Sequence, residues 1–265
     1  MVCWTEFARS CAPPSRESSI RYAVLSDIHG NSQALSAVLA DADREGARAL
    51  VCLGDLVGYG ADPVACAEAV GERAAIVVAG NHEHGVLELA SLRWFNAVAR
   101  EAVRWTRAQL SDGVRSYLGS LPLTATLEDA TLVHASPRRP EKWDYLLSAE
   151  DGFEVFGDFR TPLCFVGHSH CPGVWSLGAA GPEHAAWFTG WPAEVRLAAG
   201  RRYVINVGSV GQPRDRDPRA AYALWDLEER LVWIRRVEYD HRAAAARILE
   251  AGLPRVLAHR LASGS

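Results

Sequence analysis

The sequence contains little that would point to a membrane or to nucleic acid. Its 265 residues include one methionine and one lysine, Lys142, and the formal net charge is −4. No apolar run approaches the roughly 20 residues that a membrane-spanning helix needs. A small negative charge provides no bulk basic field for a polyanion. We therefore expect a globular protein with no membrane span and no strong nucleic-acid signal.

Cysteines are present, but they lack the spacing of a metal site or a disulfide framework. None forms a CxxC pair, and the six are Cys3, Cys11, Cys52, Cys66, Cys164 and Cys171. Cys52 and Cys164 lie inside apolar runs that are typical of buried strands. Because disulfides persist mainly in oxidising compartments, this pattern predicts reduced thiols in a cytoplasmic protein.

The N-terminal segment also lacks the continuous apolar stretch of a secretory signal, since it carries Glu6 and Arg9. Its polar and proline content predicts a flexible leader over residues 1–20. We interpret residues 21–265 as one domain that ends in a helical tail. A chain of this length can bury roughly three quarters of its unfolded surface, so its core needs no disulfide.

Several familiar catalytic signatures are incomplete. Ser209 lies in VGSVG, which misses the G-x-S-x-G motif of serine hydrolases by one glycine. The GYG at 58–60 lacks the third glycine of a dinucleotide fingerprint, and the sequence has no G-K-[ST] of a P-loop. Hydride transfer and nucleoside triphosphate motor activity are therefore unsupported.

Short apolar runs alternate with amphipathic segments in the first third of the chain. Five-residue apolar runs have the length of strands buried on both faces, and helical spacing of Leu, Val and Ala separates them. This succession indicates a parallel sheet with right-handed crossovers. The expected strands are 22–26, 49–53 and 75–79, and the expected helices are 32–44 and 63–71, with Asn31 and Asp62 as their N-caps.

The pattern of apolar residues changes after residue 118. Residues 88–118 are predicted to be mostly helical, and the tail from His241 is helical with interruptions at Gly252 and Pro254. Between them, short strands are divided by turn residues, which favours a layered α/β fold with two sheets. These expected strands are 131–133, 163–166, 195–198, 202–205, 221–225 and 232–237.

Polar side chains follow five of the predicted strands where each strand ends. In open α/β sheets, ligands bind in the crevice beyond the carboxyl ends of the strands, so we expect these segments to converge. Glycines within them would let the backbone approach a compact site closely. The segments are DIHGN at 27–31, GD at 54–55, GNHE at 80–83, His134, and GHSH at 167–170.

The residue types in these segments favour metal ions. Asp27 and His29 are two residues apart, as are His168 and His170, so each pair would point the same way in extended chain. Seven donors exceed what one ion needs and suit two divalent cations that share Asp55. The absence of thiolate favours Mn, Fe, Zn, Ni or Co over copper or an iron–sulfur cluster. The candidate ligands are Asp27, His29, Asp55, Asn81, His134, His168 and His170.

A lone histidine at a strand end is more often a structural hydrogen-bonding residue than a ligand. Five of the nine histidines lie in these segments, however, which favours a shared site. We interpret His184, His241 and His259 as surface residues. His84 adjoins the GNHE segment, and its role stays open.

These motifs, in this order, resemble the calcineurin-like metallophosphoesterase superfamily. GDLVGYGADP, LVHASP and NVGSVGQPRD further resemble its bacterial branch of small single-domain phosphoesterases. The resemblance spans Tyr22 to about Val237. It implies a four-layer α/β/β/α sandwich of two mixed sheets flanked by helices. It also implies a dinuclear metal centre that hydrolyses a small phosphoester.

The same resemblance assigns roles to residues. It implies that His82 contacts the phosphate and protonates the leaving oxygen while a metal-bound hydroxide attacks phosphorus in line, so His82 and Asp55 are the catalytic residues. An imidazole with a pKa near 6.5 can supply a proton near neutral pH. Glu83 either orients His82 or is a surface carboxylate. The implied ligands are Asp27, His29, Asp55 and His170 for one metal, and Asp55, Asn81, His134 and His168 for the other.

Two departures from the branch lie outside the ligand set, Val207 in place of proline and Ser169 in place of threonine. The related serine/threonine protein phosphatases carry arginines in their second and third motifs that clamp a phosphomonoester dianion. The matching stretches here, GDLVGYG and VAGNHE, contain no arginine, so a singly charged diester is the better match. Arg214 either supplies a replacement charge beside Asn81 and His82 in the substrate site or is a solvated loop residue.

The sequence therefore favours a dinuclear-metal phosphodiesterase. Its alternatives are a phosphomonoesterase or protein phosphatase of the same fold and a non-catalytic scaffold that retains the metal site. We expect residues 88–118, 138–145 and 178–192 to determine the choice of substrate. For most of the aromatic residues Trp94, Phe95, Trp187 and Trp191, packing in the core or at a dimer surface is favoured over stacking on the substrate.

Overall fold

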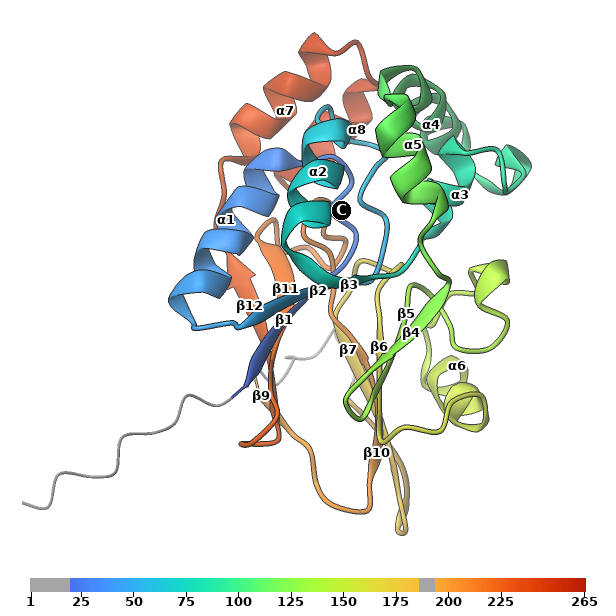
Figure 1. Cartoon of the computed structure of the whole chain (residues 1–265), viewed down its shortest axis with the longest axis vertical. Helices are drawn as coiled ribbons and strands as arrows, with labels where there is room; N and C mark the ends of the chain where they lie inside the picture. Colours follow the sequence, from blue (N-terminus) through green and yellow to red (C-terminus); the bar gives the residue numbers. More distant parts are fainter. Residues whose placement is uncertain (1–19, 186–193) are drawn as a thin grey trace, which may run out of the picture.

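Two mixed β-sheets lie face to face, and helices cover their outer faces (Figure 1). The computed structural model describes residues 20–185 and 194–265. The first sheet has the order β3-β2-β1-β11-β12-β9 and comprises β1 (Arg21–Leu25), β2 (Ala49–Cys52), β3 (Ala74–Val77), β9 (Glu194–Arg196), β11 (Ala220–Asp226) and β12 (Leu231–Val237). The second has the order β4-β5-β6-β10-β7-β8 and comprises β4 (Thr124–Leu127), β5 (Ala130–Val133), β6 (Leu163–Val166), β7 (Gly173–Gly178), β8 (Gly181–Ala185) and β10 (Arg202–Asn206).

Each sheet contains a parallel core of three strands. β1, β2 and β3 run parallel through helical crossovers, and β6 runs parallel to both β5 and β10. The remaining neighbours are antiparallel. The predicted strand–helix–strand–helix–strand succession in the first third of the chain is therefore confirmed.

The helices divide unequally between the two outer faces. Residues of α1, α2, α4, α5, α7 and α8 pack against the first sheet, whereas α6 and η3 cover the second (Figure 1). The α-helices are α1 (Ser32–Arg44), α2 (Pro63–Arg73), α3 (Asn81–Val86), α4 (Ala97–Gln109), α5 (Asp112–Gly119), α6 (Ala149–Glu154), α7 (His241–Glu250) and α8 (Arg255–Leu261). The 3₁₀ helices are η1 (Leu92–Trp94), η2 (Pro140–Lys142) and η3 (Val155–Gly157).

Alternation along the strands produces the layers. In β1, Tyr22 and Val24 face the apolar core between the sheets, while Ala23 and Leu25 face the core beneath the helices. Successive side chains of a strand point to opposite faces, so one apolar run supplies both cores. A third cluster, which includes Phe156, lies between the second sheet and α6. The four-layer α/β/β/α architecture is confirmed.

The predicted N-caps behave differently. Asn31 accepts a hydrogen bond from the backbone N–H of Ala34, as an N-cap does. Asp62 precedes α2, but its side chain makes no capping bond. Its carboxylate instead accepts from the Ser32 hydroxyl at 2.7 Å and pairs with Arg247 at 2.5 Å. Asp62 is therefore the N-cap of α2, as predicted, and Pro63 follows at the first helical position, but these donors occupy its carboxylate oxygens in place of a helix N–H.

Sequence periodicity located most elements but missed three strands. β4 alternates between exposed and half-buried residues at an edge of its sheet, so it lacks an apolar run. β7 begins on Gly173, and β8 consists of GPEHA, in which no periodic apolar signal exists. The predicted helical region 88–118 and the interrupted helical tail are confirmed by α4, α5, α7 and α8.

Some predictions from the sequence concern residues outside the described ranges. These residues are 1–19 of the predicted leader, which include Cys3 and Cys11, and Trp187 and Trp191. The boundaries of the single domain stay a prediction. Within the described residues, no helix has the length and apolarity to cross a bilayer. The four described cysteines are free and buried, in agreement with the prediction of reduced thiols; they are Cys52, Cys66, Cys164 and Cys171.

Candidate metal centre

The five polar segments converge at one edge of the two sheets, as predicted, and backbone hydrogen bonds join them. The N–H groups of Asp27 and His29 donate to the carbonyls of Gly54 and Asp55 at 3.1 and 2.8 Å. Gly167 N–H donates to the His134 carbonyl at 2.8 Å. These bonds join neighbouring loops within each sheet, and the backbone N–H of His168, which donates to Asp27 Oδ2 at 2.9 Å, joins the loops of the two sheets.

Most of the candidate ligands have a backbone conformation that L-residues rarely adopt. The φ angles of Asp27, His29 and Asp55 are 53°, 49° and 54°, and those of His168 and His170 are 65° and 61°. The prediction that the i, i+2 pairs lie in extended chain is therefore wrong. Left-handed residues at a site carry strain that the surrounding structure must outweigh, which is common where side chains are aimed at a ligand.

The candidate ligands form two buried groups that meet at Asp55, and a third group joins His29 and Asp55 to His82. Donor atoms of Asp27, His29 and His170 lie within 4.8 Å of one another, and so do those of Asp55, His134 and His168. Oδ2 of Asp55 lies 3.6 Å from His29 Nε2 and 3.4 Å from His134 Nε2, which places this carboxylate between the groups. Asp27 and His29 therefore belong to the same group, whereas His168 and His170 belong to different groups.

Hydrogen bonds to backbone carbonyls determine the tautomers of three histidines. The Nδ1 atoms lie 3.0 Å from Val57 O in His29, 2.9 Å from Leu53 O in His134 and 2.6 Å from Gln212 O in His170. A carbonyl only accepts, so each Nδ1 carries a proton and each Nε2 faces the site, where it can bind a cation whenever it carries no proton. This is the arrangement in which outer partners orient metal-binding imidazoles.

Two imidazole nitrogens that face each other provide a test of whether these residues fit a metal cation. Nε2 of His29 and Nε2 of His170 are 3.1 Å apart, and burial together with the charge of Arg214 lowers the pKa of His170 to about 4. Two lone pairs cannot bond to each other, but a cation between them can accept both. Among the described buried side chains, Asp27 Oδ1 and Asn81 Oδ1 likewise have no hydrogen-bond partner. This mixed oxygen and imidazole set fits divalent transition metals.

The charges of the cluster are mutually stabilising. Burial disfavours ionisation of Asp27 and Asp55, but the neighbouring imidazoles outweigh burial and hold the pKa of both carboxyls below its usual range. Burial also opposes charge on His134, yet Asp55 raises its pKa to about 9. Positive charge is therefore favoured beside Asp55, as a proton or as a metal cation.

His82 lies next to the groups at the first turn of α3. Its backbone N–H donates to Asp55 Oδ1 at 2.8 Å, and its ring contacts those of Tyr59 and Phe95. Its buried Nδ1 has no hydrogen-bond partner among the described residues. A Cβ at position 58, where φ is 88°, would collide with that Nδ1, so glycine is required there. Burial lowers the pKa of His82 well below its ordinary value of 6.5.

Glu83 is fully buried, so its interpretation as a surface carboxylate is wrong. Its oxygens accept from the N–H groups of Asp55 and Leu56 at 2.8 Å and of Gly80 at 2.7 Å. It therefore ties the GD loop to the GNHE loop. Burial and the charge of Asp55 raise the pKa of Glu83 to about 7.

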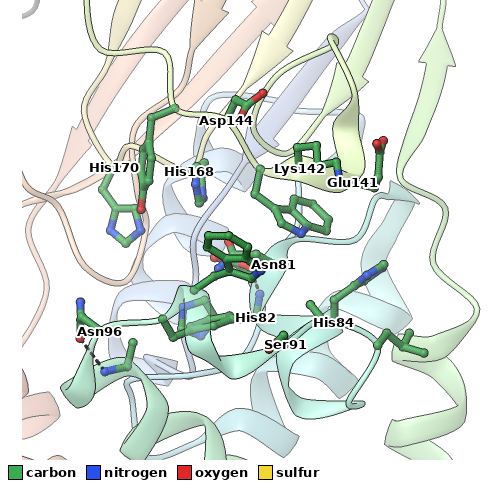
Figure 2. Close-up of a pocket in the computed structure, with 18 of the residues that line it drawn as sticks. Asn81, His82, His84, Ser91, Asn96, Glu141, Lys142, Asp144, His168 and His170 are labelled. Carbon is green, nitrogen blue, oxygen red and sulfur yellow. Dashed lines mark hydrogen bonds between the residues drawn. The ribbon is translucent and has the colours of Figure 1, made fainter.

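A cleft of about 810 Å³ opens above the two groups (Figure 2). Asn81, His82, His168 and His170 line it together with Asp55, whereas the other candidate ligands lie beneath its floor. Arg214 also lines it, so the interpretation as a solvated loop residue is wrong. The Arg214 guanidinium donates to Gln212 Oε1 at 3.0 Å and lies 5.8 Å from the centre of the Tyr59 ring.

Three aromatic residues near the groups were not identified from the sequence. They are Tyr59, within the GDLVGYG motif, and Trp143 and Tyr145 in the predicted substrate segment. Tyr145 stacks on His168 with centroids 4.0 Å apart, and Trp143 meets His134 edge-on at 5.9 Å. The aromatic content of the WDY run was the available signal.

The histidines outside the cluster also have defined positions. His84 is half-buried, lines the cleft and contacts Trp143, but it belongs to neither metal-binding group. His241 is half-buried and His259 is exposed, and the side chain of His184 lies outside the described ones. Of the predicted substrate segments, 88–118 and 138–145 line the cleft, while the described part of 178–192 does not.

Comparison with known proteins agrees with this geometry. Residues 20–172 match the family model of calcineurin-like phosphoesterases. The chain is 39% identical to uncharacterized protein MJ0912 of Methanocaldococcus jannaschii over 248 residues, which is 91% of this chain and 97% of the relative. The crystal structure of a metallophosphoesterase from Sphaerobacter thermophilus is similar with a TM-score of 0.81 and 42% identity, over 94% of this chain and all of the other.

A more distant structure shares the fold. Hypothetical protein PH1004 from Pyrococcus horikoshii aligns with a TM-score of 0.74 at 22% identity, over 93% of this chain and 99% of that one. The family match covers more than half of the chain, and the relatives match it nearly end to end. The chain belongs to the calcineurin-like phosphoesterases and is a metal-dependent phosphoester hydrolase.

Proposed function

We propose that the protein is a dinuclear-metal phosphodiesterase. Asp27, His29 and His170 would hold one divalent cation, and Asn81, His134 and His168 the other, with Asp55 shared between them. The observation that carries this proposal is the 3.1 Å separation of the His29 and His170 Nε2 lone pairs beside an unpartnered Asp27 oxygen. Two bound cations would supply Lewis acidity and a water of low pKa.

The chain's own residues would position the ester and move the proton. In the net reaction a water oxygen bonds to phosphorus and the P–O bond to the leaving group breaks. The leaving oxygen takes a proton from His82, and the remaining proton of the water goes to solvent. Burial lowers the pKa of His82 and keeps its ring neutral in the free protein. The negative charge of a bound phosphate would raise this pKa, so His82 would take up a proton only when substrate is present.

The basic groups of the cleft favour a diester. Among the described residues that line it, Arg214 is the guanidinium near the floor, and its charge reaches His82 and His170. Arg139 and Lys142 lie on the wall, where Arg139 is paired with Asp144 at 3.2 Å and Lys142 follows Glu141 in the chain. One guanidinium near the floor beside the cations suits a phosphate that carries one negative charge, while a dianion would call for a second clamp.

Metal reconstitution followed by a substrate comparison tests the proposal. The metal-stripped protein is reloaded with Mn²⁺, Fe²⁺, Zn²⁺, Ni²⁺ or Co²⁺, and its metal content and its hydrolysis of bis-p-nitrophenyl phosphate and p-nitrophenyl phosphate are measured. We expect two equivalents of metal and a higher kcat/KM for the diester. Faster hydrolysis of the monoester would overturn the diesterase assignment, and wild-type rates in both Asp55→Asn and His82→Ala would overturn the mechanism.

A further inference from the structure

The cleft above the candidate metal centre has an unusually apolar entrance. Six large hydrophobic residues of the described chain are exposed, and three of them, Leu89, Trp94 and Tyr145, line this one cleft. Trp94 is the most exposed, at 79%. An exposed apolar surface gathered at one site is typical of binding rather than of an ordinary protein surface.

Two segments form opposing walls of this entrance. Figure 2 shows His84, Ser91 and Asn96 on one side and Glu141, Lys142 and Asp144 on the other, with the candidate ligands between them. The first wall follows α3, and the second includes η2. A group attached to a phosphate at the floor would therefore pass between the walls.

The wall around η2 is held in place by the metal-site histidines. Trp143 and Arg139 have positive φ angles of 59° and 48°. The Trp143 ring meets the rings of His84 and His134 edge-on, and Tyr145 stacks on His168. Strained residues whose aromatic rings contact site histidines are organised before a ligand arrives.

The opposite wall presents a flat ring. The Arg93 guanidinium lies 5.1 Å from the centre of the Trp94 ring, and the next residue, Phe95, is buried against His82. Phe95 thus anchors the segment, while Trp94 stays largely uncovered at the mouth of the cleft. An indole held in this way offers a surface on which a planar group can stack.

The charged residues on the walls do not favour a substrate with additional phosphate groups. Lys142 and Arg139 are matched by Glu141 and Asp144, and Arg139 pairs directly with Asp144. A substrate with a chain of phosphates would need an excess of positive charge along the walls. The balance instead suits an uncharged planar group next to a single phosphate.

From these observations we infer that the cleft binds a planar aromatic group, a nucleoside base or an aryl ring, esterified to the phosphate that reacts, with Trp94 as its stacking residue. The inference rests on the proposed phosphodiesterase function and specifies its substrate class. It assigns Trp94 a role in substrate specificity and none in the chemical step.

The test uses three diesters that share a trifluoroethyl leaving group, whose release is followed by ¹⁹F NMR. The second ester group is methyl, benzyl or the 5′-oxygen of thymidine. Stacking of one ring predicts a kcat/KM at least about tenfold higher for the benzyl or thymidine ester than for the methyl ester, mainly through KM. A preference for thymidine over benzyl identifies a nucleoside, and the reverse identifies an aryl group.

Variants separate stacking from structure. Trp94→Ala should bring kcat/KM for the benzyl and thymidine esters to within about twofold of the value for the methyl ester, and Trp94→Phe should retain most of the preference. Leu249→Ala, at an exposed apolar residue that does not line the cleft, is the control and should change nothing.

The possible failures are distinguishable. Equal rates for all three esters in a protein that holds two metals would overturn the inference alone. A Trp94→Ala variant that keeps the preference but loses an oligomeric state would assign the exposed ring to an interface and also overturn it. No turnover of any ester would overturn the proposed function and this inference with it.

Discussion

Two buried clusters of charged residues lie at different places in this fold, and their chemistry is opposite. Asp41 of α1 is 5% exposed and meets only donors: the Tyr222 hydroxyl at 2.8 Å, Arg44 at 2.7 Å and Arg235 at 3.2 Å. Asp55, in the candidate metal centre, lies beside the Nε2 atoms of His29 and His134, two groups that can bind a metal cation.

The difference separates a structural carboxylate from a functional one. A buried charge surrounded by donors is satisfied by the protein itself. The Asp55 charge accepts one backbone N–H, from His82, and otherwise faces imidazoles, so it is balanced by a cation, either a proton on His134 or a metal ion. The backbone agrees, because Asp41 belongs to a regular helix while Asp55 has a φ of 54°.

Removing the central carboxylate should have the largest effect on activity. Asp55→Asn removes the shared charge of both metal-binding groups, and we expect kcat/KM to fall by about 10⁴-fold, because metal Lewis acidity supplies several kcal/mol. Metal content should fall as well. The metal-free variant should also unfold with a lower free energy than the metal-free wild type, because the Asp55 carboxylate stabilises the charge on His134. Full metal occupancy and normal turnover in this variant would contradict the assignment of Asp55 as a functional carboxylate.

His82→Ala should produce the next largest effect. Loss of a general acid typically costs 10²–10⁴-fold, so we expect kcat to fall about 10³-fold. Because His82 is outside the proposed ligand set, elemental analysis should still find two metals. An ester with a better leaving group should be less affected, and equal losses for good and poor leaving groups would contradict the role in proton transfer.

Arg214→Ala should weaken binding of the phosphate. A charge-assisted hydrogen bond is worth about 1.5–3 kcal/mol, so we expect a loss of about 10–100-fold in kcat/KM, mostly through KM. Arg214→Lys should recover part of the loss. The matched control is Arg247→Ala, at a partly exposed arginine that pairs with Asp62 away from the cleft, and it should leave KM unchanged.

Asp41→Asn should affect stability and leave catalysis intact. Its donors would lose a charged acceptor, and we expect about 1–2 kcal/mol of destabilisation in denaturant unfolding. Turnover per metal-loaded molecule should match wild type. A large loss of activity at unchanged stability would show that the two clusters do not differ as described.

The lowered pKa of Asp41 predicts that the free energy of unfolding depends on pH. Burial raises the pKa of Asp41, but hydrogen bonds from Arg235 and Tyr222 outweigh it, and the folded-state pKa lies below the ordinary value of 3.8. This contribution to stability is therefore complete above about pH 5 and is lost as the pH falls below 3.8 toward the folded-state pKa. The difference in unfolding free energy between wild type and Asp41→Asn should shrink over that range, and a constant difference would contradict it.

Much of this molecule was predictable because its signals are local. Apolar runs predicted β1, β2, β3 and β6 to within about two residues at each end, the usual uncertainty of an element boundary. Ordered motifs at the strand ends identified the residues that meet at the cluster. The edge strand β4 was missed because half of its surface is exposed and it carries no apolar run.

The amino-acid sequence by itself determined which strands form and which polar side chains follow them, since both depend on residues close together in the chain. Only the tertiary structure decided which tautomer each imidazole takes and why Glu83 is buried. Those outcomes depend on carbonyls and amides from loops as distant in sequence as Val57 and Gln212, which folding alone brings to the same site.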